Sequence, residues 1–328
     1  MAGVLDSVNQ LTELVGQNRL ELLLFRLSGR EQLYGINVFK VKEVLECPHL
    51  TAMPRLNKNV RGVAHVRGQT ISIIDMGLAI GGKMNHDLEH SYVIITEYNR
   101  SVQGFLVGGV DRIVNLDWSS IMPPKVVGKT NYLTAVTQVD KQLVEILDVE
   151  KILDEIAPND KNVSETVVEE FRKEEAEIES KMPDRPRIIR KVMVADDSSV
   201  ARNQVKRALK SINLESIVVE NGQQALDKLR ELAKNGPIQE QIGLLISDIE
   251  MPEMDGYTLT ANIRQDPKLA VLKVILHTSL SGVFNQAMVK KVGADNFIAK
   301  FNPDELAKAV RKLMDEGEEE LFQAIRNN

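Results

Sequence analysis

The chain has 328 residues, of which 43% are hydrophobic and 27% charged, and its formal net charge is −6. This length suits two folded domains better than one, and the negative charge argues against nucleic acid as a partner. The single cysteine, Cys47, cannot form an internal disulfide. No apolar run approaches the ~20 residues of a membrane helix, and the first residues lack a signal-peptide pattern. We therefore expect a cytoplasmic protein that does not insert directly into a membrane.

The first part of the chain predicts a short helix followed by a mostly β domain. Apolar residues at helical spacing over residues 4–15 predict an amphipathic helix within residues 1–17. From residue 18 to residue 157, short apolar runs broken by turns are typical of a barrel or sandwich. The clearest runs cover residues 22–25, 71–74, 92–95 and 104–107, with a hairpin over 134–147. Asp148 is expected to cap a helix that ends before Pro158.

An acidic stretch follows over residues 158–189. It carries pairs such as Glu169-Glu170 and Glu174-Glu175 and has few apolar residues. Charge runs of this kind are usually solvated. The composition therefore predicts an acidic linker with some helix.

The second half predicts an α/β domain over residues 190–316 and a helix-like tail over residues 317–328. Apolar strands alternate with helical segments, and the strands cover residues 192–195, 216–219, 244–246, 274–276 and 297–299. Continuously apolar strands in this alternation indicate a parallel sheet covered by helices on both faces. The expected fold is a doubly wound, flavodoxin-like, five-stranded sheet.

Polar residues stand where the strands of this sheet end. Asp196 and Asp197 directly follow the first strand, and Asp248 follows the third. In the strand order 2-1-3-4-5 these strands are neighbours, and their carboxyl ends line the ligand crevice. Three carboxylates this close favour a cation, and an all-oxygen set favours Mg²⁺. Thr278 and Lys300 end the next two strands, where a hydroxyl and an ammonium would hold an anionic group on Asp248.

These residues, within segments 192–197, 245–256 and 277–279 and at Lys300, resemble the signature of response-regulator receiver domains. The resemblance implies that Asp248 accepts a phosphoryl group from a histidine kinase. It also implies that Asp197 binds Mg²⁺ directly, that Asp196 binds it through water, and that the backbone carbonyl of Glu250 is a further ligand.

The same resemblance assigns roles to the ends of the last two strands. Thr278 and Lys300 would contact the phosphoryl group, and Thr278 and Phe297 would form the switch pair. One position departs from the family pattern, because Phe301 stands where receivers usually have a proline in a cis bond. A non-proline cis bond costs about 2.5–4 kcal/mol, so we expect a rearranged loop after Lys300.

The N-terminal half resembles the CheW family of chemotaxis coupling proteins. The residues that carry the resemblance lie at 25–27, 34–36, 40–44, 60–63, 66–68, 73–75 and 109–110. It implies a pair of five-stranded barrels around a shared core. It also implies receptor and kinase contacts near Val41, Glu43, Gly62, Arg67 and Gly68. Plainer interpretations stay open for these positions: a solvated Glu43, glycines that serve turns, and an Arg67 that pairs internally.

A coupling domain followed by a receiver is the arrangement of the CheV family, which the whole chain resembles. This implies a non-enzymatic adaptor that links methyl-accepting chemoreceptors to the histidine kinase CheA and lies at receptor arrays through its protein partners. Two modes of action stay open. In the first, a gate, phosphorylation of the receiver changes the contacts of the coupling domain. In the second, the receiver is a phosphate sink that drains CheA, and the coupling domain only anchors it.

Three other readings are weaker. A haloacid-dehalogenase-type phosphatase would require an aspartate where Glu250 stands. A nucleotide-binding domain would require a glycine-rich loop after the first strand, and none follows Ala195. A degenerate receiver that binds partners without phosphorylation would not need the intact polar set at the strand ends.

Overall fold

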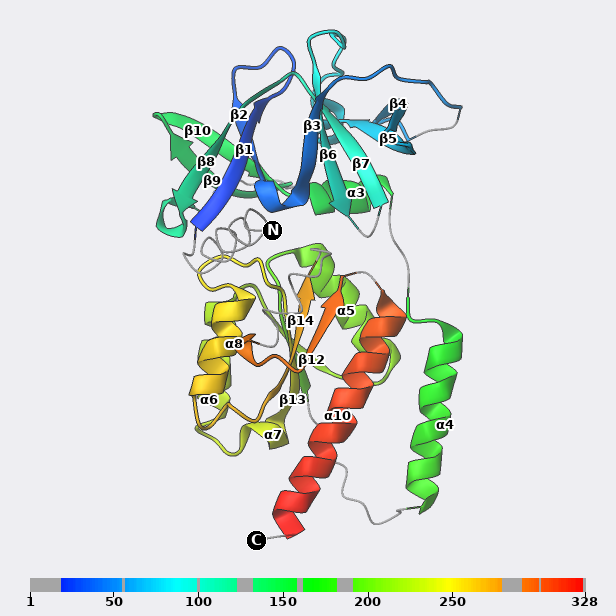
Figure 1. The fold of residues 1–328 in the computed structure, drawn as a ribbon, viewed down its shortest axis with the longest axis vertical. Helices are drawn as coiled ribbons and strands as arrows, with labels where there is room; N and C mark the ends of the chain where they lie inside the picture. The colour runs from blue at the N-terminus through cyan, green and yellow to red at the C-terminus, as the bar shows by residue number, and fades with distance from the viewer. Residues whose placement is uncertain are drawn as a thin grey trace, which may run out of the picture. The chain divides into compact units, whose positions relative to one another are not determined.

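The computed structural model describes residues 19–54, 57–98, 101–122, 132–157, 162–181, 191–278, 291–300 and 302–326. These residues form two compact units, an N-terminal unit within residues 19–159 and a C-terminal unit from residue 160 onward (Figure 1). The helix predicted within residues 1–17 lies outside the described residues. None of the described helices is both long and apolar enough to cross a membrane.

The N-terminal unit is built on two five-stranded sheets, as predicted. The first has the order β8-β1-β2-β10-β9, from β1 (Arg19–Arg26), β2 (Leu33–Asn37), β8 (Gly109–Asp117), β9 (Leu133–Val139) and β10 (Gln142–Leu147). The second has the order β3-β6-β7-β5-β4, from β3 (Val41–Glu46), β4 (Val60–Val66), β5 (Gln69–Asp75), β6 (Tyr92–Tyr98) and β7 (Ser101–Val107). Only β2–β10 and β5–β7 pair in parallel among the strand pairs of these described residues.

Each of these sheets curves so that its two edges approach each other. In the second sheet, a β-bridge joins Thr51, which follows β3, to Val63 of β4. In the first, a bridge joins Met122, which follows β8, to Val136 of β9. Connecting the edges removes exposed edge strands, and the apolar residues that alternate along each strand fill the interior.

Short helices connect the strands of this unit: η1 (Val38–Lys40), α2 (Met76–Ala79), η2 (Trp118–Ser120) and α3 (Val149–Ile156). Asp148 caps α3 as predicted, since its side chain accepts a hydrogen bond of 3.0 Å from the backbone N–H of Lys151. A nearly buried ion pair of 3.1 Å between Lys40 and Glu150 ties η1 to α3.

The C-terminal unit holds a five-stranded parallel sheet in the order β12-β11-β13-β14-β15. Its strands are β11 (Lys191–Ala195), β12 (Ser216–Val219), β13 (Ile242–Ser247), β14 (Lys273–Thr278) and β15 (Asn296–Ala299). This is the order 2-1-3-4-5 that the sequence predicts. Every residue of the central strand β13 is buried, which explains its unbroken apolar run.

Helices cover both faces of this sheet. They are α5 (Ser199–Ser211), α6 (Gly222–Leu232), α7 (Ile238–Gln241), α8 (Gly256–Gln265) and α10 (Pro303–Arg326). Val192 and Val194 of β11 pack with α5 and α10, whereas Met193 packs on the opposite face with α6 and α8. Successive side chains of a strand point to opposite faces, so one apolar strand serves two cores.

The acidic stretch contains a helix, α4 (Glu165–Lys181), which packs against the C-terminal unit. The composition predicts a solvated linker over residues 158–189, but Val163, Val167 and Phe171 are buried in one cluster with α5 and α10. The predicted tail over residues 317–328 continues α10 as far as Arg326, with Leu321 buried.

Candidate functional site

Three carboxylates meet at the carboxyl ends of β11 and β13. Asp196 and Asp197 directly follow β11, and Asp248 follows β13. The backbone N–H of Asp248 donates to the carbonyl of Ala195 at 2.8 Å, which fixes the two strand ends side by side. One carboxylate oxygen from each aspartate lies within 4.8 Å of the other two. The structure thus brings together the three residues that the sequence analysis grouped.

Lys300 reaches into this cluster from the end of β15. Its Nζ lies 2.7 Å from Oδ2 of Asp248 and 2.8 Å from Oδ2 of Asp196. Its backbone N–H donates to the carbonyl of Thr278 at 2.8 Å, so the ends of β14 and β15 are also tied together. The side chains of all these residues are buried. A buried ammonium therefore stands between two buried carboxylates.

The other oxygen of each buried aspartate is held by the backbone. Oδ1 of Asp196 accepts from the N–H of Ser198 at 2.9 Å, and Oδ1 of Asp248 accepts from the N–H of Ile249 at 2.7 Å. Because these bonds fix both carboxylates, their Oδ2 atoms meet at Lys300. Carboxylates locked in this way are preorganised for a ligand that bridges them.

The electrostatics of the cluster favour an additional cation. Burial raises the pKa of Asp196 well above its ordinary value; the Lys300 ammonium opposes this, and the charges of Asp248 and Asp197 raise it further. One ammonium leaves three carboxylates undercompensated. The donors are all oxygens, which suits a hard divalent cation such as Mg²⁺. The residues therefore fit the predicted metal, and Asp196, Asp197 and Asp248 would hold it.

Glycine at position 256 lets the loop after Asp248 fold tightly against the site. A Cβ on Gly256 would lie 2.1 Å from the carbonyl oxygen of Asp248, which no side chain tolerates. Asp255 then caps α8, since its Oδ1 accepts from the N–H groups of Tyr257 and Thr258. Glu250, whose carbonyl is a predicted metal ligand, lies half-buried in this same loop.

Arg202 on α5 is a further site residue, one that the strand-end pattern of the sequence does not indicate. Its Nη1 donates to the carbonyls of Asp196 at 2.7 Å and Asp197 at 2.9 Å, and its Nη2 donates to Glu220 at 2.9 Å. The guanidinium thus holds the backbone of both metal-site aspartates to the end of β12. The signal in the sequence was an arginine one helical turn into the helix that follows the aspartate pair.

Phe297 lies half-buried on β15 and packs with Ile249, Tyr257 and Leu276. Thr278 is fully buried at the end of the neighbouring strand. The switch role predicted for these two residues stays a prediction. Phe301 lies outside the described residues, and so does the predicted rearrangement of its loop.

In the N-terminal unit, two of the predicted contact residues pair with each other. Nη2 of Arg67 lies 2.7 Å from Oε2 of Glu43, and the Arg67 side chain is 77% exposed while that of Glu43 is 18% exposed. This agrees with the interpretation that Arg67 pairs internally. Arg67 still presents most of its surface to solvent. Val41, half-buried, begins β3 on the same edge.

The two glycines of the predicted surface have backbone roles. Gly62 has a φ of +154°, and a Cβ there would lie 2.6 Å from the carbonyl oxygen of Thr51. Gly68 has a φ of +83° in the turn between β4 and β5. Gly62 therefore permits the close approach to the Thr51 carbonyl, and Gly68 permits the turn.

Comparisons with known proteins agree with this division of the chain. Residues 21–157 match the CheW-like domain family, and residues 192–311 match the response regulator receiver domain family. The fold and the site thus define a protein in which a CheW-like domain precedes a receiver domain.

Relatives over the full length show the same arrangement. The chain is 31% identical to "Chemotaxis protein CheV3" of Helicobacter pylori, over 91% of this chain and 96% of that protein. It is 29% identical to "Chemotaxis protein CheV1" of the same organism, over 96% and 99%. Its N-terminal part is 30% identical to "Chemotaxis protein CheW" of Klebsiella aerogenes, over 47% of this chain and 91% of that protein. The chain belongs to the CheV family of chemotaxis proteins.

Proposed function

We propose that this protein couples methyl-accepting chemoreceptors to the histidine kinase CheA and that phosphorylation of Asp248 regulates the coupling. The observation that supports phosphorylation most directly is the arrangement around Asp248. Its Oδ2 faces the buried ammonium of Lys300, and two further carboxylates stand within 4.8 Å as a cation site. Positioning and charge compensation are what phosphoryl transfer needs from a protein.

The protein's own residues would act on the transfer as follows. Oδ2 of Asp248 forms a bond to phosphorus as the N–P bond of a phosphohistidine donor breaks, and the departing imidazole nitrogen takes up a proton. Oδ1 stays held by the N–H of Ile249. The ammonium of Lys300 and the hydroxyl of Thr278 stabilise the charge on the phosphoryl oxygens. Mg²⁺ held by Asp196, Asp197 and Asp248 would supply further charge neutralisation.

The test is transfer of radiolabelled phosphate from phosphorylated CheA to the full chain. We expect labelling that needs Mg²⁺ and is lost in Asp248→Asn. A matched control is Asp227→Asn, on the exposed surface of α6 in the same unit, which should label like the wild type. Labelling that persists in Asp248→Asn would reject Asp248 as the acceptor.

For the coupling contacts, we propose a surface that includes Val41, Glu43, Gly62, Arg67 and Gly68. The charges that face a partner there belong to the Glu43–Arg67 pair, whose arginine is mostly exposed. Exposed charges contribute only about 0–1 kcal/mol to stability through their ion pairs, so Arg67 can be changed without unfolding the domain, whereas Glu43 is largely covered. Charges at the rim of an interface set association rate and specificity.

Reversing the pair separates a binding role from a structural one. Glu43→Arg together with Arg67→Glu keeps the ion pair but inverts the charges that a partner meets. If the surface binds receptor or CheA, both the single and the double variants lose affinity in pull-down. If the ion pair only joins β3 to the turn between β4 and β5, the double variant recovers wild-type binding, and this surface is not the interface.

The phosphate-sink alternative differs in one measurable way. A sink drains phosphate from CheA while the affinities of the coupling domain stay constant. A gate changes receptor or CheA affinity when a phosphoryl mimic such as beryllofluoride occupies Asp248. Equal affinities with and without the mimic would leave only the sink.

A further inference from the structure

Helix α4 occupies a defined surface on the C-terminal unit. Figure 1 shows it beside the first part of α10. Val167 and Phe171 are one helical turn apart on α4, and with Val163, just before the helix, they enter the apolar cluster that α5 and α10 share with the sheet. The exposed side of α4 is acidic, so the helix has one apolar face, and that face is covered by α10.

Polar contacts fix α4 along about two turns of α10. The backbone N–H of Ser164 donates to Oδ1 of Asp304 at 2.7 Å. Farther along, Nη1 of Arg311 donates to Glu175 at 2.7 Å, and the Arg311 guanidinium lies 5.9 Å from the centre of the Phe171 ring. The Arg311 side chain is only 16% exposed. This combination of apolar, charged and cation–π contacts is that of a specific interface.

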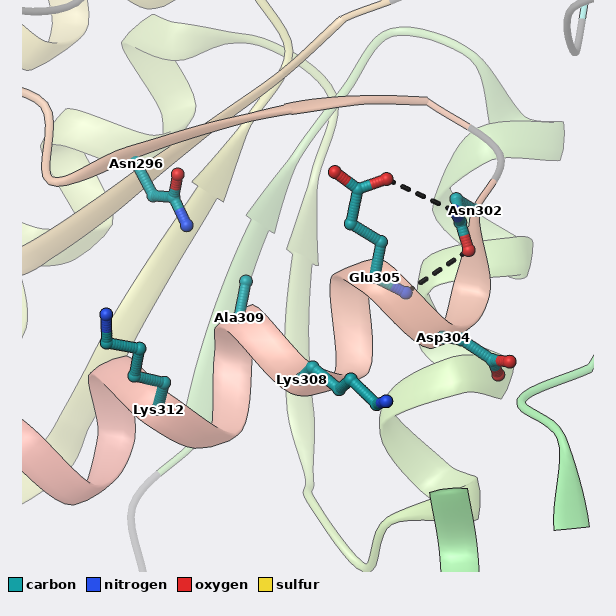
Figure 2. A pocket seen from close by; sticks show the side chains of 7 residues that line it. All are labelled: Asn296, Asn302, Asp304, Glu305, Lys308, Ala309 and Lys312. Carbon is teal, nitrogen blue, oxygen red and sulfur yellow. Dashed lines mark hydrogen bonds between the residues drawn. The ribbon is translucent and has the colours of Figure 1, made fainter. Parts of the chain in front are cut away.

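The start of α10 connects this interface to the phosphorylation site. Asn302 and Glu305 form reciprocal hydrogen bonds that cap the helix (Figure 2). Pro303 is the first residue of the helix. Asp304, which anchors Ser164, belongs to that same turn. It lies four residues after Lys300, whose ammonium contacts Asp248 and Asp196. A shift of Lys300 would thus occur close to the anchor of α4.

Docking of α4 also sets the length of the connection between the two units. With Ser164 anchored, the chain from the end of α3 runs only through residues 157–163, which span at most about 25 Å when fully extended. With α4 released, the connection runs through residues 157–190 and could span roughly 115 Å. Release would therefore lower the effective concentration of one unit at the other.

We propose that α4 is held on α10 while Asp248 is unphosphorylated and is released when Asp248 is phosphorylated. This inference rests on the proposed function. A cation alone can replace the ammonium at Asp196 while Lys300 stays on Asp248. A phosphoryl group on Asp248 then draws Lys300 off that carboxylate as well, the start of α10 shifts, and Asp304 no longer meets Ser164. An isolated helix of this length is marginal in water, so released α4 also frays.

Hydrogen exchange of the full chain, followed by mass spectrometry, tests this directly. With Mg²⁺ and beryllofluoride, we expect the amides of residues 165–175 to exchange at least about fivefold faster than with Mg²⁺ alone, the lower end of typical allosteric coupling. Peptides that cover residues 248–256 report whether the mimic is bound. The mimic bound with α4 protection unchanged overturns the release of α4. No effect at residues 248–256 instead counts against the proposed phosphorylation site.

Variants separate docking from phosphorylation. Phe171→Ala should expose the α4 amides without any mimic, while the amides of β11 and β13 stay protected. Lys173→Ala, on the exposed side of the same helix, should leave α4 protected. Asp248→Asn should keep α4 docked when beryllofluoride is added. Protection of α4 that survives Phe171→Ala would show that the observed packing does not hold the helix.

Discussion

Lys300 and Asp196 form an ion pair of 2.8 Å although their strands, β15 and β11, are separated by two others in the sheet. The long lysine side chain crosses the ends of β14 and β13 to make this contact. Lys300 therefore takes one of the oxygens that a bound cation would use. A cation and the ammonium compete for Asp196, and this competition links metal binding to the position of Lys300.

Lys300→Met should make the C-terminal unit depend on Mg²⁺. Removing one partner of a buried ion pair costs about 3–5 kcal/mol, because the remaining charges lose their compensation. We expect a drop of this order in the free energy of unfolding without Mg²⁺, and a larger increase of the melting temperature on adding Mg²⁺ than in the wild type. Denaturation of both proteins with and without Mg²⁺ measures it. Equal Mg²⁺-induced shifts would contradict the competition.

Arg202→Lys should weaken Mg²⁺ binding although Arg202 would not touch the metal. A lysine keeps the charge but cannot make the three contacts that hold the Asp196–Asp197 backbone and Glu220. Losing a group that orients metal ligands typically lowers affinity 10–100-fold, and we expect about tenfold here. Calorimetric titration with Mg²⁺ provides the measurement. Lys206→Ala, exposed on the same helix, should bind Mg²⁺ normally; a similar loss in both variants would indicate general damage to α5.

His277 should make the C-terminal unit less stable in acid. Burial, with a smaller contribution from Lys300, lowers the pKa of His277 to about 3. Its ordinary value is 6.5. Between these values the unfolded chain binds a proton that the folded chain does not, so stability falls as the pH drops from 6.5 toward 3. The slope from one such group is at most ~1.4 kcal/mol per pH unit.

Denaturation at several pH values, with His277→Leu beside the wild type, isolates this contribution. Between pH 6.5 and 3 the free energy of unfolding of the variant should fall less steeply with pH than that of the wild type, because leucine does not titrate. His86→Gln, at an exposed position in the other unit, should leave the slope intact. A wild-type slope that persists in His277→Leu would assign the acid sensitivity to other groups.

Gly256→Ala should damage the site through the backbone. The added Cβ would meet the Asp248 carbonyl oxygen at 2.1 Å, so the loop after β13 must shift. Overpacking of this kind costs about 1–3 kcal/mol. We expect that loss of stability together with slower phosphorylation by a small phosphodonor. Gly109→Ala, where nothing lies within 4 Å of the added Cβ, should be close to neutral. Unchanged phosphorylation in Gly256→Ala would show that the loop adapts.

The parallel sheet and its carboxylate cluster were predictable because each depends on local sequence. Buried strands appear as unbroken apolar runs, and the polar residue after each strand must lie at the carboxyl edge. The contacts of Arg202 were not predictable, since they depend on the rotation of α5 relative to the loop. The Glu43–Arg67 pair depends on how far the second sheet curves.

The docking of α4 was also beyond the sequence, for a different reason. Val163, Val167 and Phe171 are sparse among glutamates, and such a segment is solvated unless a matching surface exists. That surface is on α10, more than a hundred residues later, and includes Asp304 and Arg311. The composition of the α4 segment reflects that segment alone, whereas its burial depends on both α4 and α10.

The anchored α4 also decides where the receiver can be cut from its neighbour for separate study. A fragment that starts near residue 192, where the match to the receiver domain family begins, would lack α4 and uncover the apolar surface around Arg311 and Met314. Such a fragment would be prone to self-association. One that starts at residue 162 keeps Val163, Val167 and Phe171 as the cover of that surface, so we expect it to stay monomeric.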